Sequence, residues 1–285
     1  MSPETQASEA LPSRRRRTPR GGRHRGTESF VLPPGAPPLV LAVPGSATGG
    51  GGTIAAELAV LVETEQTGQP ALVGHLEGEE ASLRSVLAGV RQQRPEEPAA
   101  VVVPLLAGPH PRIDPMLREA VASAPAPVLL ADPLGPHPQI AAALHERLAE
   151  AGLARADRIR MMSMVTAASG FLVVTPGEQP ALRQAEVTSV LLASRLAAPV
   201  FTALLDDPAG IDAAVRQLRE AGANRLALAP YIINGEPYRE AIAAAAARAQ
   251  AEYAAPIGAH PALAELAALR YTEAMERALT ALEHR

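Results

Sequence analysis

The segment Asp132-Pro-Leu-Gly-Pro-His-Pro138 returns later in the chain as Ala255-Pro-Ile-Gly-Ala-His-Pro261. His137 and His260, which hold the same place in the two segments, are 123 residues apart in a chain of 285. An internal repeat of this length determines the architecture, because each copy must form the same supersecondary units. The sequence therefore predicts two homologous domains.

A second pair of segments supports the repeat. Val101-Val-Val-Pro-Leu-Leu-Ala-Gly108 matches Leu226-Ala-Leu-Ala-Pro-Tyr-Ile-Ile-Asn-Gly235, and the aligned prolines Pro104 and Pro230 are 126 residues apart. An amphipathic helix is predicted shortly before each segment, so the elements follow in the same order in both halves. This order supports a duplication of one structural unit.

Each half alternates short apolar runs with amphipathic stretches, which is the pattern of a parallel sheet covered by helices. In the first half we predict strands at Leu39–Val43, Ala71–Leu76, Ala100–Leu106 and Val128–Ala131, and helices at Thr53–Thr67, Ala81–Gln93, Arg112–Ala122 and Pro138–Ala151. In the second half we predict strands near 160–167, 199–205, 225–231 and 254–257, and helices near 178–196, 209–221, 236–252 and 261–283. The expected fold class is α/β, with two tandem domains at 37–152 and 158–285, each a four-stranded mostly parallel sheet with helices on both faces.

The composition excludes several kinds of chemistry. The chain is 47% hydrophobic but has only three Phe, four Tyr and no Trp, so aliphatic residues must fill its core. It contains no cysteine, which excludes disulfides, thiolate metal sites and cysteine nucleophiles. All 26 basic residues are arginine, so there is no lysine for a Walker A loop or a Schiff base.

The N-terminal residues differ in composition from the rest of the chain. Residues 1–30 carry seven Arg and three Glu, whereas the remainder holds 19 Arg against 27 acidic residues. We predict that residues 1–36 form a disordered Arg-rich tail, for which a solvated tail is favoured over a weak phosphate-binding arm. The acidic body does not continue a basic surface, so no nucleic-acid partner is expected.

The sequence predicts no targeting or membrane segment. The arginines Arg14–Arg17 are followed by the proline-rich stretch Val31–Pro38 rather than by an apolar export segment. The longest apolar runs, such as Ala99–Ala107, are too short to cross a bilayer. We therefore expect a cytoplasmic protein with no membrane partner, while its oligomeric state stays open.

Ligands of open parallel sheets bind beyond the carboxyl ends of the strands, and three candidate metal ligands fall there. His110 follows the third strand, between Pro109 and Pro111, and Glu77 follows the neighbouring strand. His75 shares a strand face with Glu77 by the two-residue period. Imidazole and carboxylate groups are ligands of divalent ions. We predict that His75, Glu77 and His110 converge on one divalent ion, although His110 taken alone is more simply read as an exposed, inert side chain.

Other motifs favour structural roles. The glycine run Gly49–Gly52 lacks the spacing of a dinucleotide-binding loop, so a flexible loop is favoured over a phosphate site. Ser46 lacks the Gly-x-Ser-x-Gly spacing of a nucleophile elbow. His137 and His260 stand before the last helix of each half, and their repetition favours a turn or capping role over metal binding.

Taken together, the segments of the first half resemble the sirohydrochlorin chelatases, which have the class II chelatase fold. The matching segments are Val43-Pro-Gly-Ser46, Leu76-Glu-Gly-Glu-Glu-Ala-Ser-Leu83, Val101-Val-Val-Pro-Leu105, Gly108-Pro-His-Pro-Arg-Ile-Asp114 and Pro133-Leu-Gly-Pro-His-Pro138. The resemblance extends over roughly residues 38–285, since long bacterial members of this family carry two such domains.

The resemblance implies a reaction and a set of site residues. It implies insertion of Fe²⁺ or Co²⁺ into a polycarboxylate tetrapyrrole of the sirohydrochlorin type, in sirohaem or cobalamin biosynthesis. His110 would be the metal ligand or base and Glu77 its partner. Ser46 and Arg112 would bind the substrate, with Arg112 on a carboxylate. The metal is a substrate in this reaction, and no permanently bound cofactor is expected.

One position departs from the family pattern. Pro44 stands where the family has the histidine of His-Gly-Ser, and proline can neither bind a metal nor accept a proton. We expect the second domain to offer no replacement, taking Ala167–Gly170 and Ile233–Glu236 as its corresponding segments. We hypothesise that His75 partly replaces the lost ligand.

The departure at Pro44 leaves alternatives open. One is a degenerate, non-catalytic paralogue that binds a tetrapyrrole or metal without turning it over. A more remote one is a small-molecule sensor, which the two-lobed α/β layout alone would favour.

Overall fold

The computed structural model describes residues 31–48, 50–155 and 167–283. Along these segments the strands are β1 (Leu39–Val43), β2 (Leu72–His75), β3 (Ala100–Pro104), β4 (Val128–Leu130), β5 (Gly170–Thr175), β6 (Val200–Leu204), β7 (Leu226–Pro230) and β8 (Glu252–Tyr253). The helices are α1 (Gly50–Leu61), α2 (Leu83–Gly89), α3 (Ile113–Ala122), α4 (Pro138–Glu150), α5 (Gln179–Leu196), α6 (Pro208–Glu220), α7 (Arg239–Ala249) and α8 (Pro261–Glu283). A π-helical turn, Val62–Thr67, follows α1, and a 3₁₀ turn, Glu236–Tyr238, precedes α7.

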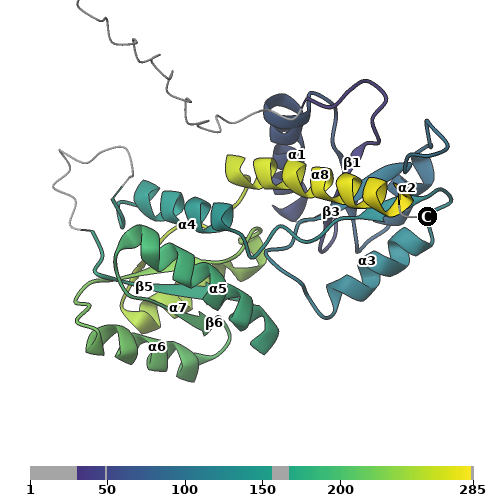
Figure 1. Cartoon of the computed structure of the whole chain (residues 1–285). Coiled ribbons are helices and arrows are strands. Elements are labelled where there is room, and N and C mark those ends of the chain that lie inside the picture. The colour runs from purple at the N-terminus through teal and green to yellow at the C-terminus, as the bar shows by residue number, and fades with distance from the viewer. Residues whose placement is uncertain (1–30, 49, 156–166, 284–285) are drawn as a thin grey trace, which may run out of the picture.

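The strands form two separate parallel sheets with the same topology (Figure 1). The first has the order β2-β1-β3-β4 and the second the order β6-β5-β7-β8. The central strands β1, β3, β5 and β7 are buried throughout, as expected of strands covered by helices on both faces. The predicted fold class, two tandem four-stranded α/β domains, is confirmed.

The first strand of the second half lies later in the sequence than predicted. Of the predicted range 160–167, residues 160–166 lie outside the described part of the chain, and the strand is β5 at Gly170–Thr175. The run Phe171-Leu-Val-Val-Thr175 is wholly buried, so burial selected this stretch. The proposed correspondence of Ala167–Gly170 with the loop after β1 is therefore wrong. The equivalent of Pro44-Gly45 is Pro176-Gly177, and both glycines have positive φ, +85° and +108°.

Matching hydrogen bonds give the register of the repeat. The Leu76 N–H donates to Val43 O at 3.0 Å, and the Leu205 N–H donates to Thr175 O at 2.9 Å. Likewise, the Leu134 N–H donates to Leu106 O, and the Ile257 N–H donates to Ile232 O. In this register Glu77 corresponds to Asp206 and His110 to Glu236. The second domain thus carries carboxylates at both equivalent positions.

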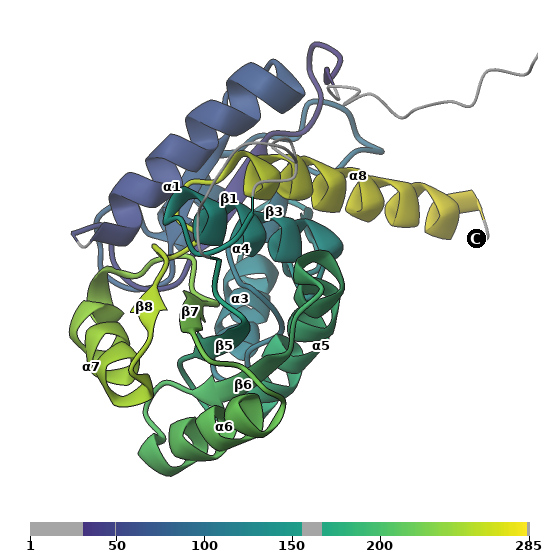
Figure 2. The same ribbon diagram turned by 90° about the vertical axis from the view of Figure 1, so that its left-hand side faces the viewer.

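The last helix of each domain packs on the other domain. In Figure 1, α4 lies among the elements of the second domain, against α5 and β7, and α8 lies against α1 and β3 of the first. Figure 2 shows α8 extending along the first domain beside β3. Two arginines hold this exchange: Arg147 of α4 donates to Ile257 O at 3.0 and 2.8 Å, and Arg270 of α8 donates to Pro133 O at 2.8 Å and Leu134 O at 3.2 Å.

The exchange produces one shared core and two outer ones. The shared core joins the inner faces of both sheets, including Leu41, Val103, Phe171 and Tyr231, with apolar residues of α1, α4, α5 and α8. The outer faces are covered by α2 and α3 in the first domain and by α6 and α7 in the second. The largest core therefore belongs to neither domain alone.

The end of the predicted tail is packed on the first domain. The Leu32 N–H donates to Thr67 O at 2.9 Å, and Gln69 Nε2 donates to Leu32 O and Pro33 O. Residues 31–36 therefore belong to the folded part, while residues 1–30 lie outside the described residues. Within the described segments, no helix combines the length and hydrophobicity needed to cross a membrane.

Candidate functional site

The loops after β1 and β2 lie together at the carboxyl edge of the first sheet. The Glu77 N–H donates to Gly45 O at 3.1 Å, and Gly78 lies against the Ser46 side chain. Ser46 Oγ is hydrogen-bonded to Thr48 Oγ1 at 3.0 Å. Glu77 is exposed and Ser46 half-buried. The structure therefore brings the predicted residues Ser46 and Glu77 to one edge, where both are accessible to a ligand.

His110 is half-buried and held at the start of α3. Its main-chain N–H donates to Asp114 Oδ1 at 3.0 Å, and its carbonyl oxygen accepts from the Ile113 and Asp114 N–H groups. Its imidazole Nδ1 accepts from the Arg112 N–H at 3.3 Å. The Arg112 side chain is exposed. The resulting turn fixes the direction of the imidazole and presents Arg112 beside it.

The same imidazole hydrogen bond occurs at two other positions. Nδ1 of His137 accepts from the Gln139 N–H and Nδ1 of His260 from the Ala262 N–H, each at 3.2 Å. The predicted capping role of these two histidines is confirmed. His110 is also followed by proline, but its hydrogen bond goes to Arg112, which precedes α3, so it orders the turn before the helix rather than capping it.

The hydrogen bond from the Arg112 N–H constrains the chemistry of the His110 imidazole. A nitrogen that accepts a hydrogen bond carries no proton, so the neutral imidazole of His110 bears its proton on Nε2. In this state Nε2 can donate a hydrogen bond to a carboxylate of a ligand. To bind a metal ion or accept a proton through Nε2, the ring must first give up the Arg112 N–H.

His75 lies in the core rather than in the site. It is 3% exposed, on the same sheet face as its partner Val43, and its Nδ1 has no hydrogen-bond partner in the structure. Burial lowers the pKa of His75, against an opposing effect of the Glu80 carboxylate. A neutral, enclosed imidazole at this place cannot reach an ion at the exposed Glu77 without a rearrangement of the strand end.

The three predicted ligands are not gathered into a preformed metal centre. Among the described residues, which include His75, Glu77 and His110, no group of three or more His, Cys, Asp or Glu side chains is placed to hold a metal ion. The central strand β1 separates β2, which precedes Glu77, from β3, which precedes His110. Pro44 lies at the end of that central strand, so the missing ligand is the one between the other two.

The second domain holds the loop that carries His110. Gln184 Nε2 of α5 donates to Pro109 O at 2.7 Å, and the Tyr231 hydroxyl donates to Ala107 O at 2.5 Å. A Cβ atom at Gly108 would overlap the Gln184 side chain. Sequence reasoning missed Gln184 and Tyr231. Tyr231 corresponds to the apolar Leu105, and a polar residue in an apolar place of the repeat was the available signal.

The glycine run makes the equivalent contact in the other direction, from the first domain to a loop of the second. Gly50–Gly52 form the first turn of α1, so they are helical rather than a flexible loop, and Gly49 lies outside the described residues. A Cβ atom at Gly50 would lie 2.9 Å from Glu236 Cβ, and one at Gly51 would lie 2.9 Å from Asn234 Nδ2. Glycine at these places therefore allows α1 to approach the loop after β7.

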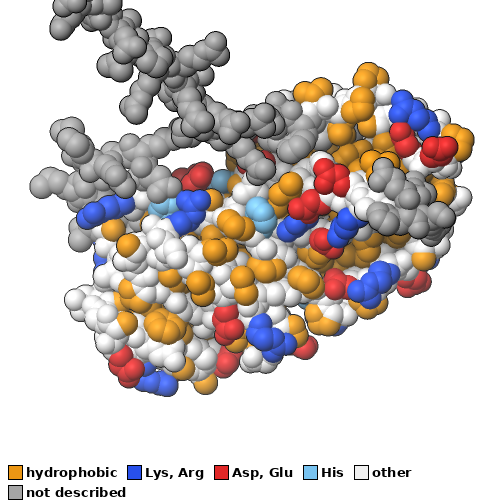
Figure 3. Space-filling model, in the orientation of Figure 1, with side chains coloured by type: hydrophobic (Ala, Val, Ile, Leu, Met, Phe, Trp, Pro, Cys, Tyr) orange, Lys and Arg blue, Asp and Glu red, His pale blue; other side chains and the backbone are white. Residues whose placement is uncertain are grey.

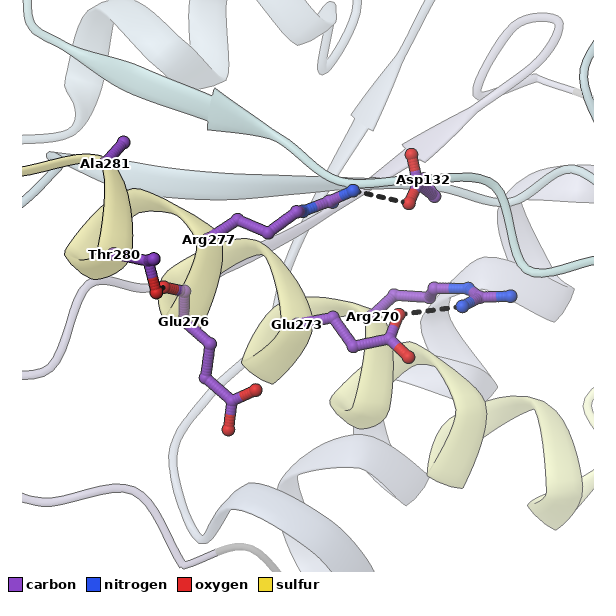
Figure 4. Close-up of a pocket in the computed structure, with 7 residues that line it drawn as sticks. All are labelled: Asp132, Arg270, Glu273, Glu276, Arg277, Thr280 and Ala281. Atoms are coloured by element: carbon purple, nitrogen blue, oxygen red, sulfur yellow. Dashed lines mark hydrogen bonds and ion pairs between the residues drawn. The ribbon is translucent and has the colours of Figure 1, made fainter. Parts of the chain in front are cut away.

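Two depressions flank this interdomain region. One, of about 570 Å³, lies between the start of α1 and the loop that carries Glu236. The other, of about 770 Å³, lies between α8 and Asp132 after β4 (Figure 4). In the latter, Arg277 pairs with Asp132 and Arg270 with Glu273, at 2.6 and 2.7 Å. Figure 3 shows acidic and basic side chains interspersed on this side of the molecule, so the described part of that face has no single-sign field.

Comparison with known proteins assigns the first domain. Residues 38–151 match the family model CbiX. The N-terminal domain belongs to the CbiX family. The resemblance that the sequence motifs carried is thus confirmed for this domain. No curated protein matches the chain.

Two solved structures resemble both halves. One is CbiX, the terminal enzyme for biosynthesis of sirohaem in denitrifying bacteria, with 20% identity and a TM-score of 0.57 over 84% of this chain and 99% of that one. The other is a multi-domain protein of Deinococcus radiodurans with structural similarity to chelatases, with 19% identity and a TM-score of 0.59 over 88% of this chain. This chain spans 60% of the Deinococcus protein. At such identities the likeness establishes the fold, two tandem chelatase-like domains.

Proposed function

We propose that this protein is a sirohydrochlorin chelatase that inserts a divalent metal, Fe²⁺ or Co²⁺, into a polycarboxylate tetrapyrrole. The observation that carries the proposal is the CbiX match over residues 38–151, within which Glu77 and His110 follow β2 and β3 at one sheet edge. We place the reaction in the cytoplasm, in sirohaem or cobalamin biosynthesis. Two tandem domains and the carboxyl-edge position of the polar residues support this assignment.

The chemistry requires two pyrrole protons to leave as the metal enters the ring. His110 accepts a proton through Nε2, or binds the entering ion there, after releasing the Arg112 N–H. Glu77, exposed at the same edge, supplies a carboxylate to the ion. Arg112 binds a carboxylate of the substrate, and Ser46 donates a hydrogen bond to it. His75 enters only if the end of β2 opens, since its imidazole is buried.

A second candidate function is binding of a tetrapyrrole or metal without turnover. Pro44 favours it, because the position between Glu77 and His110 carries no ligand. The hydrogen bond from the Arg112 N–H to Nδ1 of His110 favours it too, because Nε2 then carries the ring proton and is a donor. The two candidates agree on the ligand and differ in whether metal enters the ring.

The experiment is an insertion assay with sirohydrochlorin and each metal, followed by the change in absorbance. The chelatase proposal expects a rate above the spontaneous one for the natural chain and a loss of that rate in H110A. H110N is the matched variant, because asparagine keeps an acceptor for the Arg112 N–H but has no imidazole. We expect H110N to fold as stably as the natural chain and to be inactive, whereas H110A also loses the hydrogen bond to the Arg112 N–H, which contributes about 1 kcal/mol.

One result would contradict the chelatase proposal, and two others would contradict the role assigned to His110. Binding of sirohydrochlorin with no rate above the spontaneous reaction would leave the binding protein as the function. Full activity of both H110A and H110N would show that the reaction does not use this histidine. A loss of activity in H110A with full activity in H110N would leave His110 only its structural role as acceptor for the Arg112 N–H.

A further inference from the structure

The 570 Å³ depression lies between the two domains, and neither Glu77 nor His110 lines it. Its walls come from the first turns of α1, the loop after β7, α7 and the segment after β8. It lies beyond the carboxyl end of β7, where ligands of open parallel sheets bind. Its volume falls within the range of small-molecule sites.

Two charged groups of opposite sign meet at this depression. Arg239 Nη2 donates to both carboxylate oxygens of Glu236, at 2.9 and 2.6 Å. Both side chains are largely exposed, 73% for Arg239 and 56% for Glu236. An ion pair this exposed contributes little to stability, so it can be exchanged for another at small cost. The Glu236 carboxylate marks where Arg239 donates to an anionic oxygen.

The rest of the lining is mainly apolar. Ile54, Ile233, Ile242 and Pro256 contribute aliphatic surface, and Tyr253, a large hydrophobic residue that is 48% exposed, adds an aromatic ring. A Cβ atom at Gly50 would lie 2.9 Å from Glu236 Cβ, so glycine lets the start of α1 form one wall of the depression close to Glu236.

We propose that this depression binds a largely apolar ligand that carries a carboxylate, with Arg239 binding the carboxylate and Glu236 acting as an internal competitor for it. The carboxylate can come from an arm of a tetrapyrrole or from a small free acid. The site uses none of the residues assigned to metal insertion, so it can be tested independently of the proposed function.

The test uses 1-pyrenebutyrate as a fluorescent probe and 1-pyrenebutanol, which lacks the carboxylate, as its matched control. The site predicts that R239Q weakens binding of 1-pyrenebutyrate at least tenfold and that E236Q strengthens it about tenfold. R248Q is the control variant, because Arg248 lies on the same helix and pairs with Asp212 outside the depression. It should bind the probe as the natural chain does, and 1-pyrenebutanol should bind all variants alike.

Three outcomes would overturn the site. They are equal binding of 1-pyrenebutyrate to R239Q and the natural chain, an equal effect of R248Q, and no binding to either the natural chain or E236Q. Competition with uroporphyrin, which has eight carboxylates, then identifies the source. Displacement of the probe assigns the site to a tetrapyrrole arm, and a retained probe assigns it to a small acid. Thermal unfolding of each variant verifies that the fold is intact.

Discussion

His110 combines a structural contact with the role we propose for it. Its Nδ1 accepts from the Arg112 N–H in the turn before α3, and its neighbour Pro109 is held by Gln184 from the other domain. These contacts orient the imidazole, and they also occupy its Nδ1 atom. His110 thus has a proposed role in metal insertion and a structural role as acceptor for the Arg112 N–H. Comparing H110A with H110N separates the two roles.

At Pro44 we expect a gain from restoring the family's histidine. P44H places an imidazole at the end of β1, between the loops that carry Glu77 and His110, and should complete a three-ligand site. The prediction is that P44H binds Co²⁺ at least tenfold more tightly than the natural chain and inserts it faster, measured by calorimetry and by the insertion assay. P44A is the control, because it removes the proline without adding a ligand. A P44H variant no better than P44A would contradict the assigned site.

At the scale of elements, the start of α1 owes its position to glycine. Gly50 and Gly51 face the Glu236 and Asn234 side chains, so the first turn of α1 lies against a loop of the other domain. The loop after β3 is held in the equivalent way against α5, through Gly108 and Gln184. Each domain thus places the loop after its third strand in sequence against the first long helix of the other domain.

Side chains added to the α1 glycines should weaken this contact. We expect G51V to lower the free energy of unfolding by about 1–3 kcal/mol, because the added atoms overlap the Asn234 amide and must displace it. G89A at the end of α2 is the control, since no atom lies within 4 Å of the added Cβ and it should be neutral or stabilising. Urea unfolding measures both. An unchanged midpoint in G51V would show that the interdomain contact contributes nothing.

At the scale of the whole molecule, the exchanged helices make the two domains one folding unit. Arg270 is 14% exposed and donates to two carbonyls of the first domain, and Arg147 donates to the equivalent carbonyl of the second. Tyr271 adds a buried hydrogen bond to Pro37 O at 2.8 Å. The C-terminal helix therefore closes the first domain, and the shared core forms only when both halves are present.

Removing the hydrogen bonds of Arg270 to the first domain should destabilise the whole molecule, which should still unfold in one cooperative step. R270M leaves the Pro133 and Leu134 carbonyls without their donor, so we expect a loss of about 1–3 kcal/mol. R84M is the control, because Arg84 forms an exposed pair with Glu119 and should change stability by less than about 0.5 kcal/mol. Two separate transitions in calorimetry, one per domain, would contradict a shared core.

Stability should fall in mild acid. Burial lowers the pKa of His75, His137 and His260 below 6.5 in the folded protein, with Arg270 also lowering that of His137 and Arg147 that of His260. Nearby carboxylates oppose these shifts: Glu80 at His75, Glu273 at His137, and Glu146 and Glu150 at His260. Because the unfolded chain binds protons first, stability is fully present above pH 6.5 and declines as pH falls towards the folded pKa values.

The slope is at most about 1.4 kcal/mol per pH unit for each histidine. Urea unfolding between pH 7.5 and 5.5 measures it. The variants H137N and H260N keep a capping acceptor and cannot titrate, so they should flatten the profile. A stability that rises on acidification over this range would overturn the assignment of neutral imidazoles at these positions.

The sequence by itself determined the duplication, the α/β class and the family of the first domain. Short apolar runs, helix periodicity and repeated His-Pro turns are local signals, and they depend only on which residues follow one another. It also placed Ser46, Glu77 and His110 after their strands. It misplaced β5 and its proline–glycine turn, because neighbouring apolar stretches of a sequence look equally suited to a central strand.

Tertiary structure alone decided what surrounds these residues. The exchange of α4 and α8, the hold of Gln184 and Tyr231 on the loop of His110, and the burial of His75 all join segments distant in the chain. Local patterns carry no information on such contacts, because they depend on how two sheets pack across a shared core. The same packing opened a depression beside Arg239, between the start of α1 and the loop after β7.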